Sequence, residues 1–191
     1  SVANKYYYSD GNVDTSTSSG SIVMSQAFGL YSTSATGTLE SSTFDMGSVS
    51  NFYALNWNPL SQPALTGAGS VKFQFATNPT STSTPWTYLG PDGTQNTYFT
   101  VPGTQVSALH NGNEFARYAA YLTTATATVT PSVNDVSFTY TSGCTPPGQV
   151  IFQGLSAGDY TLTISKAGYT TSVVPVTVSG NWANQTVLLG N

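Results

Sequence analysis

The chain has 191 residues, of which 39% are hydrophobic and only 6% are charged, with a net charge of −4. A soluble domain usually carries about a quarter charged residues, whereas here 25 Ser and 30 Thr supply most of the polar character. Four cations leave no basic patch for nucleic acid, and the apolar fraction excludes disorder through low hydrophobicity. The length allows one or two domains with enough core to fold without disulfides.

Residues 1–36 predict an aromatic strand at 5–8, a polar turn, and a second strand at 22–28. The turn contains Asp10, Asn12 and Asp14, whose oxygens recur at alternate positions and suit Ca²⁺ as hard ligands. Ser21 stands where an EF-hand would place its bidentate Glu, and Asp and Asn also cluster in ordinary turns. No other cofactor is expected, and calcium at these three residues stays an open alternative.

Residues 37–143 alternate strand and turn signals at the spacing typical of a β-sandwich. No window shows a convincing helical period. The turns contain Pro, Gly, Asn and Asp, which favour reversals through their backbone preferences. Strands are predicted at 37–44, 50–58, 70–77, 86–90, 97–101, 114–124 and 133–141.

Twenty-four aromatic residues invite a carbohydrate-binding interpretation, with Trp57, Trp86 and Tyr88 as the candidate ligand residues. Most aromatics in a strand-rich chain belong to the core, so packing is the competing interpretation for each of them. Arg117 is expected to pair with Glu40, Asp45 or Glu114, because a half-buried guanidinium keeps its charge.

The residues that would perform catalysis do not form a recognisable set. His110 lies in a turn-like His-Asn-Gly-Asn string, and no neighbour in the sequence would orient it. Cys144, the sole cysteine, is expected either to be a small buried side chain or to pair with a partner elsewhere. No carboxylate pair suggests glycoside hydrolysis. The sequence therefore predicts a protein that is not an enzyme.

The last segment, residues 144–191, predicts a hairpin between strands 149–155 and 159–166, followed by strands 172–179 and 184–189. Apolar Tyr160, Leu162 and Ile164 alternate with polar residues, which is the period-2 pattern of a half-buried strand. Four strands are too few for a closed sandwich. We therefore expect a strand from elsewhere to complete this module: residues 1–36, an upstream segment, or a neighbouring subunit.

Two strings carry a resemblance to known families. The run from Gln149 to Tyr169 resembles the C-terminal hairpin of carboxypeptidase-regulatory-like and Cna-B-type modules. Strings such as 70–77, 86–93 and 115–122 resemble a discoidin-like, galactose-binding-like jelly roll. Their succession is similar to the carboxyl ends of large prepilin-associated bacterial surface proteins. The resemblance implies a jelly-roll-like antiparallel β-sandwich followed by a small, incomplete Ig/transthyretin-like β module.

These expectations combine into a non-catalytic extracellular protein of the cell surface, structural or adhesive, in a pilus or filament assembled through β modules. The alternative is a carbohydrate-binding module of a secreted enzyme or adhesin. A homo-oligomer or filament is the expected partner state, and a surface glycan is a further candidate partner. The sequence has no run of eighteen apolar residues, so no membrane span is predicted. It also shows no signal peptide, and the chain is therefore expected to be part of a longer precursor. The sequence leaves open the ligand, the anchor and the source of the missing strands.

Overall fold

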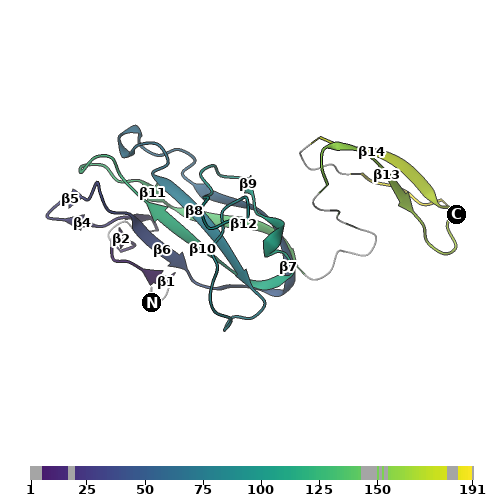
Figure 1. Cartoon of the computed structure of the whole chain (residues 1–191), viewed down its shortest axis with the longest axis horizontal. Helices are drawn as coiled ribbons and strands as arrows, with labels where there is room; N and C mark the ends of the chain where they lie inside the picture. The colour runs from purple at the N-terminus through teal and green to yellow at the C-terminus, as the bar shows by residue number, and fades with distance from the viewer. Residues whose placement is uncertain are drawn as a thin grey trace. The chain divides into compact units, whose positions relative to one another are not determined.

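The computed structural model describes residues 6–16, 20–142, 150, 152, 155–179 and 185–190. The chain divides into two compact units, residues 1–149 and 150–191, which Figure 1 shows with their strands labelled. In the described residues the regular elements are β-strands and two three-residue 3₁₀ turns, η1 (Ala64–Thr66) and η2 (Ala108–His110). The predicted all-β fold is confirmed, while the jelly-roll strand order stays a prediction.

The larger unit contains twelve described strands, and every strand pairing in it is antiparallel. The strands are β1 (Tyr6–Ser9), β2 (Val13–Asp14), β3 (Ile22–Met24), β4 (Gln26–Ala27), β5 (Leu30–Tyr31), β6 (Gly37–Ser41), β7 (Phe44–Asn58), β8 (Val71–Asn78), β9 (Thr104–Gln105), β10 (Asn113–Leu122), β11 (Ser132–Val133) and β12 (Asp135–Ser142).

Strand β7 joins the two layers of this unit. Its first residues, Phe44 and Asp45, pair with β10, which also pairs with β6 and β8. Its later part, 50–58, pairs with β12, and residues 54–55 pair with β9. One layer is therefore β1-β6-β10-β8 and the other is β9-β7-β12, an arrangement consistent with a β-sandwich.

Aromatic side chains fill the space between the layers. The Phe52 ring from β7 meets the Phe75 ring from β8 edge-on, with 5.4 Å between centroids, and the Trp57 ring lies 4.7 Å from that of Phe73. Phe52, Phe73 and Phe75 are all essentially inaccessible to solvent. Each large apolar side chain buried in this way contributes about 1.5–3 kcal/mol. This core positions the two sheets.

Two predicted strands of the larger unit, 86–90 and 97–101, form single bridges instead. Leu89 bridges to Phe75, and Phe99 bridges to Phe73, with backbone N–H···O distances of 2.8–2.9 Å. The segment thus extends the sheet beyond β8 at only two points. The N-terminal strands belong to this unit, since β1 pairs with β6 and β3 pairs with β11.

The smaller unit contains one described hairpin, β13 (Gly158–Ile164) and β14 (Ser172–Val178). No described residue from 150 onward is buried. The predicted strand at 149–155 falls mostly outside the described residues, and 185–190 have no strand assignment. The Thr170 N–H donates to the Gly190 carbonyl at 2.9 Å, which ties that last segment to the end of the hairpin.

Candidate functional site

The outer face of the β6-β10-β8 sheet carries an ordered set of polar and aromatic side chains. Alternation along β10 directs Tyr118 and Ala120 to the core, so Arg117, Ala119 and Tyr121 face the other way. Cross-strand register adds neighbours on the same outer face, because directly paired residues point to the same side. These neighbours are Ala76, Gln74 and Lys72 on β8 and Glu40 and Thr38 on β6.

Arg117 lies at the centre of a cluster that we call the Arg117 face, made of Tyr7, Glu40, Thr43, Trp86, Tyr88 and Arg117. The guanidinium carbon lies 3.8 Å from the Tyr7 ring centroid and 4.3 Å from the Trp86 centroid. Nε donates to the Thr43 hydroxyl at 2.8 Å. The side chain is 6% exposed, and its buried Nη1 has no hydrogen-bond partner.

This environment differs from the carboxylate partner that the sequence predicts for Arg117. Two ring faces and a hydroxyl surround the charge instead, because a planar guanidinium stacks well on aromatic rings. Glu40 accepts a hydrogen bond from the Tyr88 hydroxyl at 2.9 Å. The carboxylate therefore anchors a tyrosine rather than an arginine.

Tyr88 remains a protonated donor across the physiological pH range. Burial and the hydrogen bond to Glu40 raise the pKa of the Tyr88 phenol far above its ordinary value, although nearby Arg117 opposes this shift. Tyr88 belongs to the segment beyond β8, and Glu40 lies on β6, so their bond spans the outer face. Ala76 and Ala119 lie on this same face and are almost fully buried. Small side chains in the middle of the sheet leave room for such a crossing.

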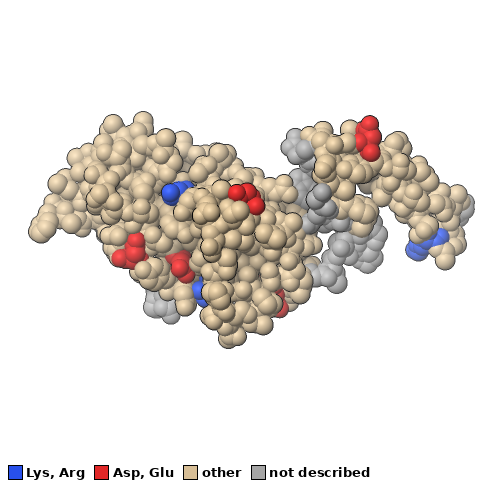
Figure 2. Space-filling model, viewed as in Figure 1, with Lys and Arg blue, Asp and Glu red and all other residues tan. Residues whose placement is uncertain are grey.

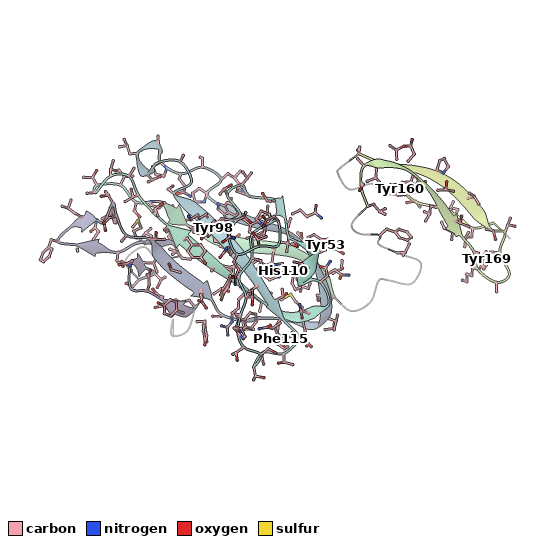
Figure 3. All side chains as sticks on the ribbon, viewed as in Figure 1. Tyr53, Tyr98, His110, Phe115, Tyr160 and Tyr169 are labelled. Atoms are coloured by element: carbon pink, nitrogen blue, oxygen red, sulfur yellow. The ribbon has the colours of Figure 1, made fainter. Side chains whose placement is uncertain are left out.

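A second set of contacts continues along the same face. The Tyr121 hydroxyl donates to Gln74 Oε1 at 2.9 Å, and Gln74 Nε2 donates to two carbonyls of the segment beyond β8. Burial, with smaller contributions from Tyr98 and Glu40, raises the pKa of Tyr121 to about 12. Lys72 Nζ lies 4.2 Å above the Tyr98 ring, which is labelled in Figure 3. Two of the four cations thus lie on aromatic rings of one sheet face.

The structure brings together two of the three predicted glycan residues. Trp86 and Tyr88 both contribute to the Arg117 face. Trp57 is 3% exposed and packs on Phe73 in the core, so its ring offers no surface to a ligand. Sequence reasoning missed Tyr7 as a partner of this site, because β1 is distant in sequence from β10. The feature of the sequence that could have indicated this site is a single arginine in a chain with many aromatic residues and few carboxylates.

The side chains of the predicted calcium residues make hydrogen bonds to nearby residues and to the start of β6. Asp10 Oδ1 accepts from the Asn12 N–H at 2.8 Å, and Oδ2 accepts from the Thr38 N–H at 3.0 Å. Asp14 Oδ1 accepts from the Ser16 N–H and hydroxyl. Among the described residues, no three His, Cys, Asp or Glu side chains gather at a site for a metal ion. Calcium stays a prediction, to be checked by a rise in melting temperature in millimolar Ca²⁺ over chelator.

His110 belongs to the core rather than to a reactive surface. It is 2% exposed, its ring meets Phe75 edge-on at 5.2 Å, and the Thr77 hydroxyl lies 3.1 Å from Nδ1. Burial lowers the pKa of His110 to about 4, so the ring is neutral at pH 7. Cys144 lies outside the described residues.

A pocket of about 320 Å³ opens between β10 and the segment preceding β12. Tyr6, Leu39 and Tyr118 line one part of it, and Asn134 and Asp135 line another. Burial and the nearby Asp135 carboxylate raise the pKa of Tyr118 to about 12. The lining of the pocket therefore includes a tyrosine that stays protonated at neutral pH and the side chain of Asp135.

Comparison with known proteins returns no match among family models, curated proteins or solved structures. No helix in the described part of the chain is long and apolar enough to cross a membrane.

Proposed function

We propose that this protein is a non-catalytic structural or adhesive component of the extracellular cell surface, which assembles into a pilus or filament through its β modules. The observation that carries the proposal is the β13–β14 hairpin. Leu162, Val174 and Val176 share one face in register, yet no described residue of this unit is buried.

An isolated two-stranded hairpin is marginally stable in water, and three or more strands with an apolar face are needed for independent stability. Figure 2 shows a surface with few charged atoms, consistent with the 6% charged residues of the sequence. Few charges mean little mutual repulsion between neighbouring copies. An exposed strand edge then favours addition of a further strand. The jelly-roll-like and Cna-B-like resemblances of the sequence agree with a role in a surface appendage.

Sedimentation velocity over a concentration series tests assembly, with negative-stain microscopy to detect filaments. We expect concentration-dependent oligomers, and we expect a chain ending at residue 149 to associate more weakly. A monomer at every concentration up to the millimolar range, with no filaments, would contradict the proposal.

The non-catalytic part of the proposal is supported by the burial of His110, whose described neighbours are Thr77 and Phe75. A buried neutral imidazole in the core is not placed to activate a nucleophile on a substrate. A panel of peptide, ester and glycan substrates is expected to show no turnover. Activity that copurifies with the protein through several columns would refute this part.

The second candidate function, carbohydrate binding, is favoured by the Arg117 face. There Trp86 and Tyr88 lie with Glu40 and the 65%-exposed Tyr7 around one guanidinium. Aromatic rings with polar groups at their edges suit ligands that have an apolar face and a hydroxylated rim.

A glycan array followed by titration calorimetry tests this candidate. If a glycan binds here, Trp86→Ala should weaken the affinity at least tenfold, which is about 1.4 kcal/mol. Tyr160→Ala, an aromatic substitution in the smaller unit, is the matched control and should leave the affinity unchanged. An unchanged melting temperature for both variants excludes unfolding as the cause. Absence of binding to any glycan would remove the candidate.

A further inference from the structure

The two edges of the β13–β14 hairpin are not equivalent. Residues 158–164 pair with 172–178 without interruption, and Thr161 stands opposite Pro175. An antiparallel ladder alternates pairs that exchange N–H···O bonds with pairs that do not. Pro175 has no N–H, so its pair with Thr161 belongs to the second kind. The backbone groups of these two residues therefore point outward, to opposite edges.

The outer edge of β13 is the one suited to a further strand. Asp159 and Thr163 lie two residues on either side of Thr161, so their N–H and C=O groups point to the same edge. No proline or bulge interrupts the edge between 158 and 164. The outer edge of β14 lacks its central donor at Pro175, which is how natural sheets protect an edge. In the described part of the chain, β14 is the sole strand paired with β13.

The residue pattern of β13 is nearly symmetric about Leu162. Thr161 and Thr163 flank it, and Tyr160 and Ile164 follow on the apolar face. A two-fold axis through Leu162 thus places like side chains on like faces. Figure 3 labels Tyr160 within this hairpin.

We propose that β13 pairs with β13 of a second copy of this chain, antiparallel, with Leu162 directly opposite Leu162 of the second copy. Thr161 and Thr163 then exchange backbone hydrogen bonds across the axis, and Tyr160 faces Ile164 of the second copy. Such aromatic–β-branched pairs are favourable across strands. The result is a four-stranded sheet, β14-β13-β13-β14.

Charge determines the direction of the pairing. Asp159 and Lys166 are the two charged residues between 150 and 191, and Figure 2 shows the acidic and basic side chains of this unit at its opposite ends. Antiparallel pairing brings each Asp159 beside the end that carries Lys166 of the other copy. Parallel pairing would instead bring like charges together. Exposed pairs contribute little affinity, so their effect is on register and orientation.

The inference rests on the proposed assembly function and narrows it. Self-pairing through a two-fold axis is isologous and closes on itself, so this contact gives a dimer and not an open filament. A filament would need a further contact from elsewhere in the molecule.

Disulfide trapping tests the register in the full chain carrying Cys144→Ser. We expect Leu162→Cys to form a covalent dimer on mild oxidation, because residues at the centre of a non-hydrogen-bonded pair lie about 4.5 Å apart at Cα. Val174→Cys is the matched control: Val174 pairs with Leu162 on the same face but lies one strand farther from the axis. We expect the Val174→Cys variant to stay monomeric on non-reducing gels.

Edge and charge variants test the same inference without cysteine. Thr161→Pro removes an N–H that points to the outer edge and not to β14, just as Pro175 lacks an N–H at the outer edge of β14. It should raise the dimer dissociation constant at least tenfold while far-UV circular dichroism stays unchanged. Asp159→Lys and Lys166→Asp should each weaken the dimer severalfold, and the double exchange should restore it.

The outcomes separate this inference from the function it narrows. If the chain associates but Val174→Cys crosslinks as well as Leu162→Cys, or Thr161→Pro has no effect, the β13 pairing is wrong and assembly stands. If the chain does not associate at all, both fall. A Leu162-specific crosslink that Thr161→Pro prevents supports both.

Discussion

Arg117 shows how a chain with few carboxylates accommodates a buried cation. Its charge lies between two ring faces, and one donor is satisfied by Thr43. Both interactions depend on the planar guanidinium, since each ring needs a flat face and Nε needs its fixed direction. A lysine ammonium at the same place has neither a flat face for the two rings nor a donor with a fixed direction towards Thr43.

We therefore expect Arg117→Lys to lower the free energy of unfolding by about 1–3 kcal/mol, through one lost charged hydrogen bond and two lost stacking contacts. Lys72→Met, which removes the other ring-bound cation of this face, is the control and should cost less because Lys72 is partly exposed. Urea denaturation of both variants is the measurement. Equal losses would show that planarity is unimportant.

His110 predicts a pH dependence with a definite sign. Its pKa falls from 6.5 to about 4 on folding, so the unfolded chain takes up the proton first as the pH drops. The contribution to stability is complete above about pH 6.5 and is lost as the pH falls towards 4. The loss amounts to about 3 kcal/mol.

Thermal unfolding between pH 7 and 4 checks this expectation, with His110→Gln as the comparison. The variant is less stable at pH 7 but should lack the slope in this interval. Hydrogen bonds from Thr97 and Thr94 lower the pKa of Asp92. The contribution of Asp92 to stability is therefore lost below about pH 4, outside the interval measured for His110. An identical slope in the variant would assign the dependence to another group.

At the scale of elements, runs of strand-forming residues between turn formers located several strands. The predicted 70–77, 114–124, 159–166 and 172–179 correspond to β8, β10, β13 and β14 with end shifts of one or two residues. The predicted strand 37–44 corresponds to β6, and the predicted strand 50–58 covers only the later part of the long β7, because Gly47 interrupts the pattern where the strand passes between layers. Segments 86–90 and 97–101 have strand-like residues, but turns at Gly90 and Pro91 limit them to one bridge each.

The Arg117 face could be predicted only in part, because its residues come from strands that lie far apart in the sequence. Trp86 and Tyr88 were named as candidates because aromatic rings suit carbohydrate ligands, and the same criterion also selected the buried Trp57. Their partners come from β1, β6 and β10, and such long-range register is not visible in a single sequence.

Gly90 provides a test of the turn that holds this segment. A Cβ on Gly90 would lie 2.4 Å from Thr97 backbone atoms, while its N–H donates to the Thr94 carbonyl at 2.8 Å. We expect Gly90→Ala to destabilise the larger unit by about 1–3 kcal/mol, the usual cost of overpacking. Gly112→Ala is the control for glycine chemistry without a clash, because nothing lies within 4 Å of its added Cβ. Since Gly112 has a φ of +85°, about 1 kcal/mol is its expected cost. Chemical denaturation compares the two variants. A smaller loss of unfolding free energy for Gly90→Ala than for Gly112→Ala would show that Gly90 does not pack closely against Thr97.

At the scale of the whole molecule, the sequence predicts modules of 37–143 and 144–191 with an N-terminal segment of 36 residues. The compact units of the structure divide between residues 149 and 150, and the N-terminal strands are counted with the larger unit. Pro146, Pro147 and Gly148 mark the junction in composition. Composition indicates where a module ends, but the assignment of β1 and β3 depends on pairing with β6 and β11, which no local pattern reveals.

The division into units makes a last prediction about folding. Every residue of the aromatic core, from Met24 to Val133, belongs to the larger unit, so its stability should not depend on residues after 149. A chain of residues 1–149 is expected to unfold cooperatively, with a melting temperature within about 2 °C of the main transition of the full chain. Differential scanning calorimetry of the two chains provides the comparison. A large drop, or a transition that loses cooperativity, would mean that residues 150–191 support the core, and the two units would then be one folding unit.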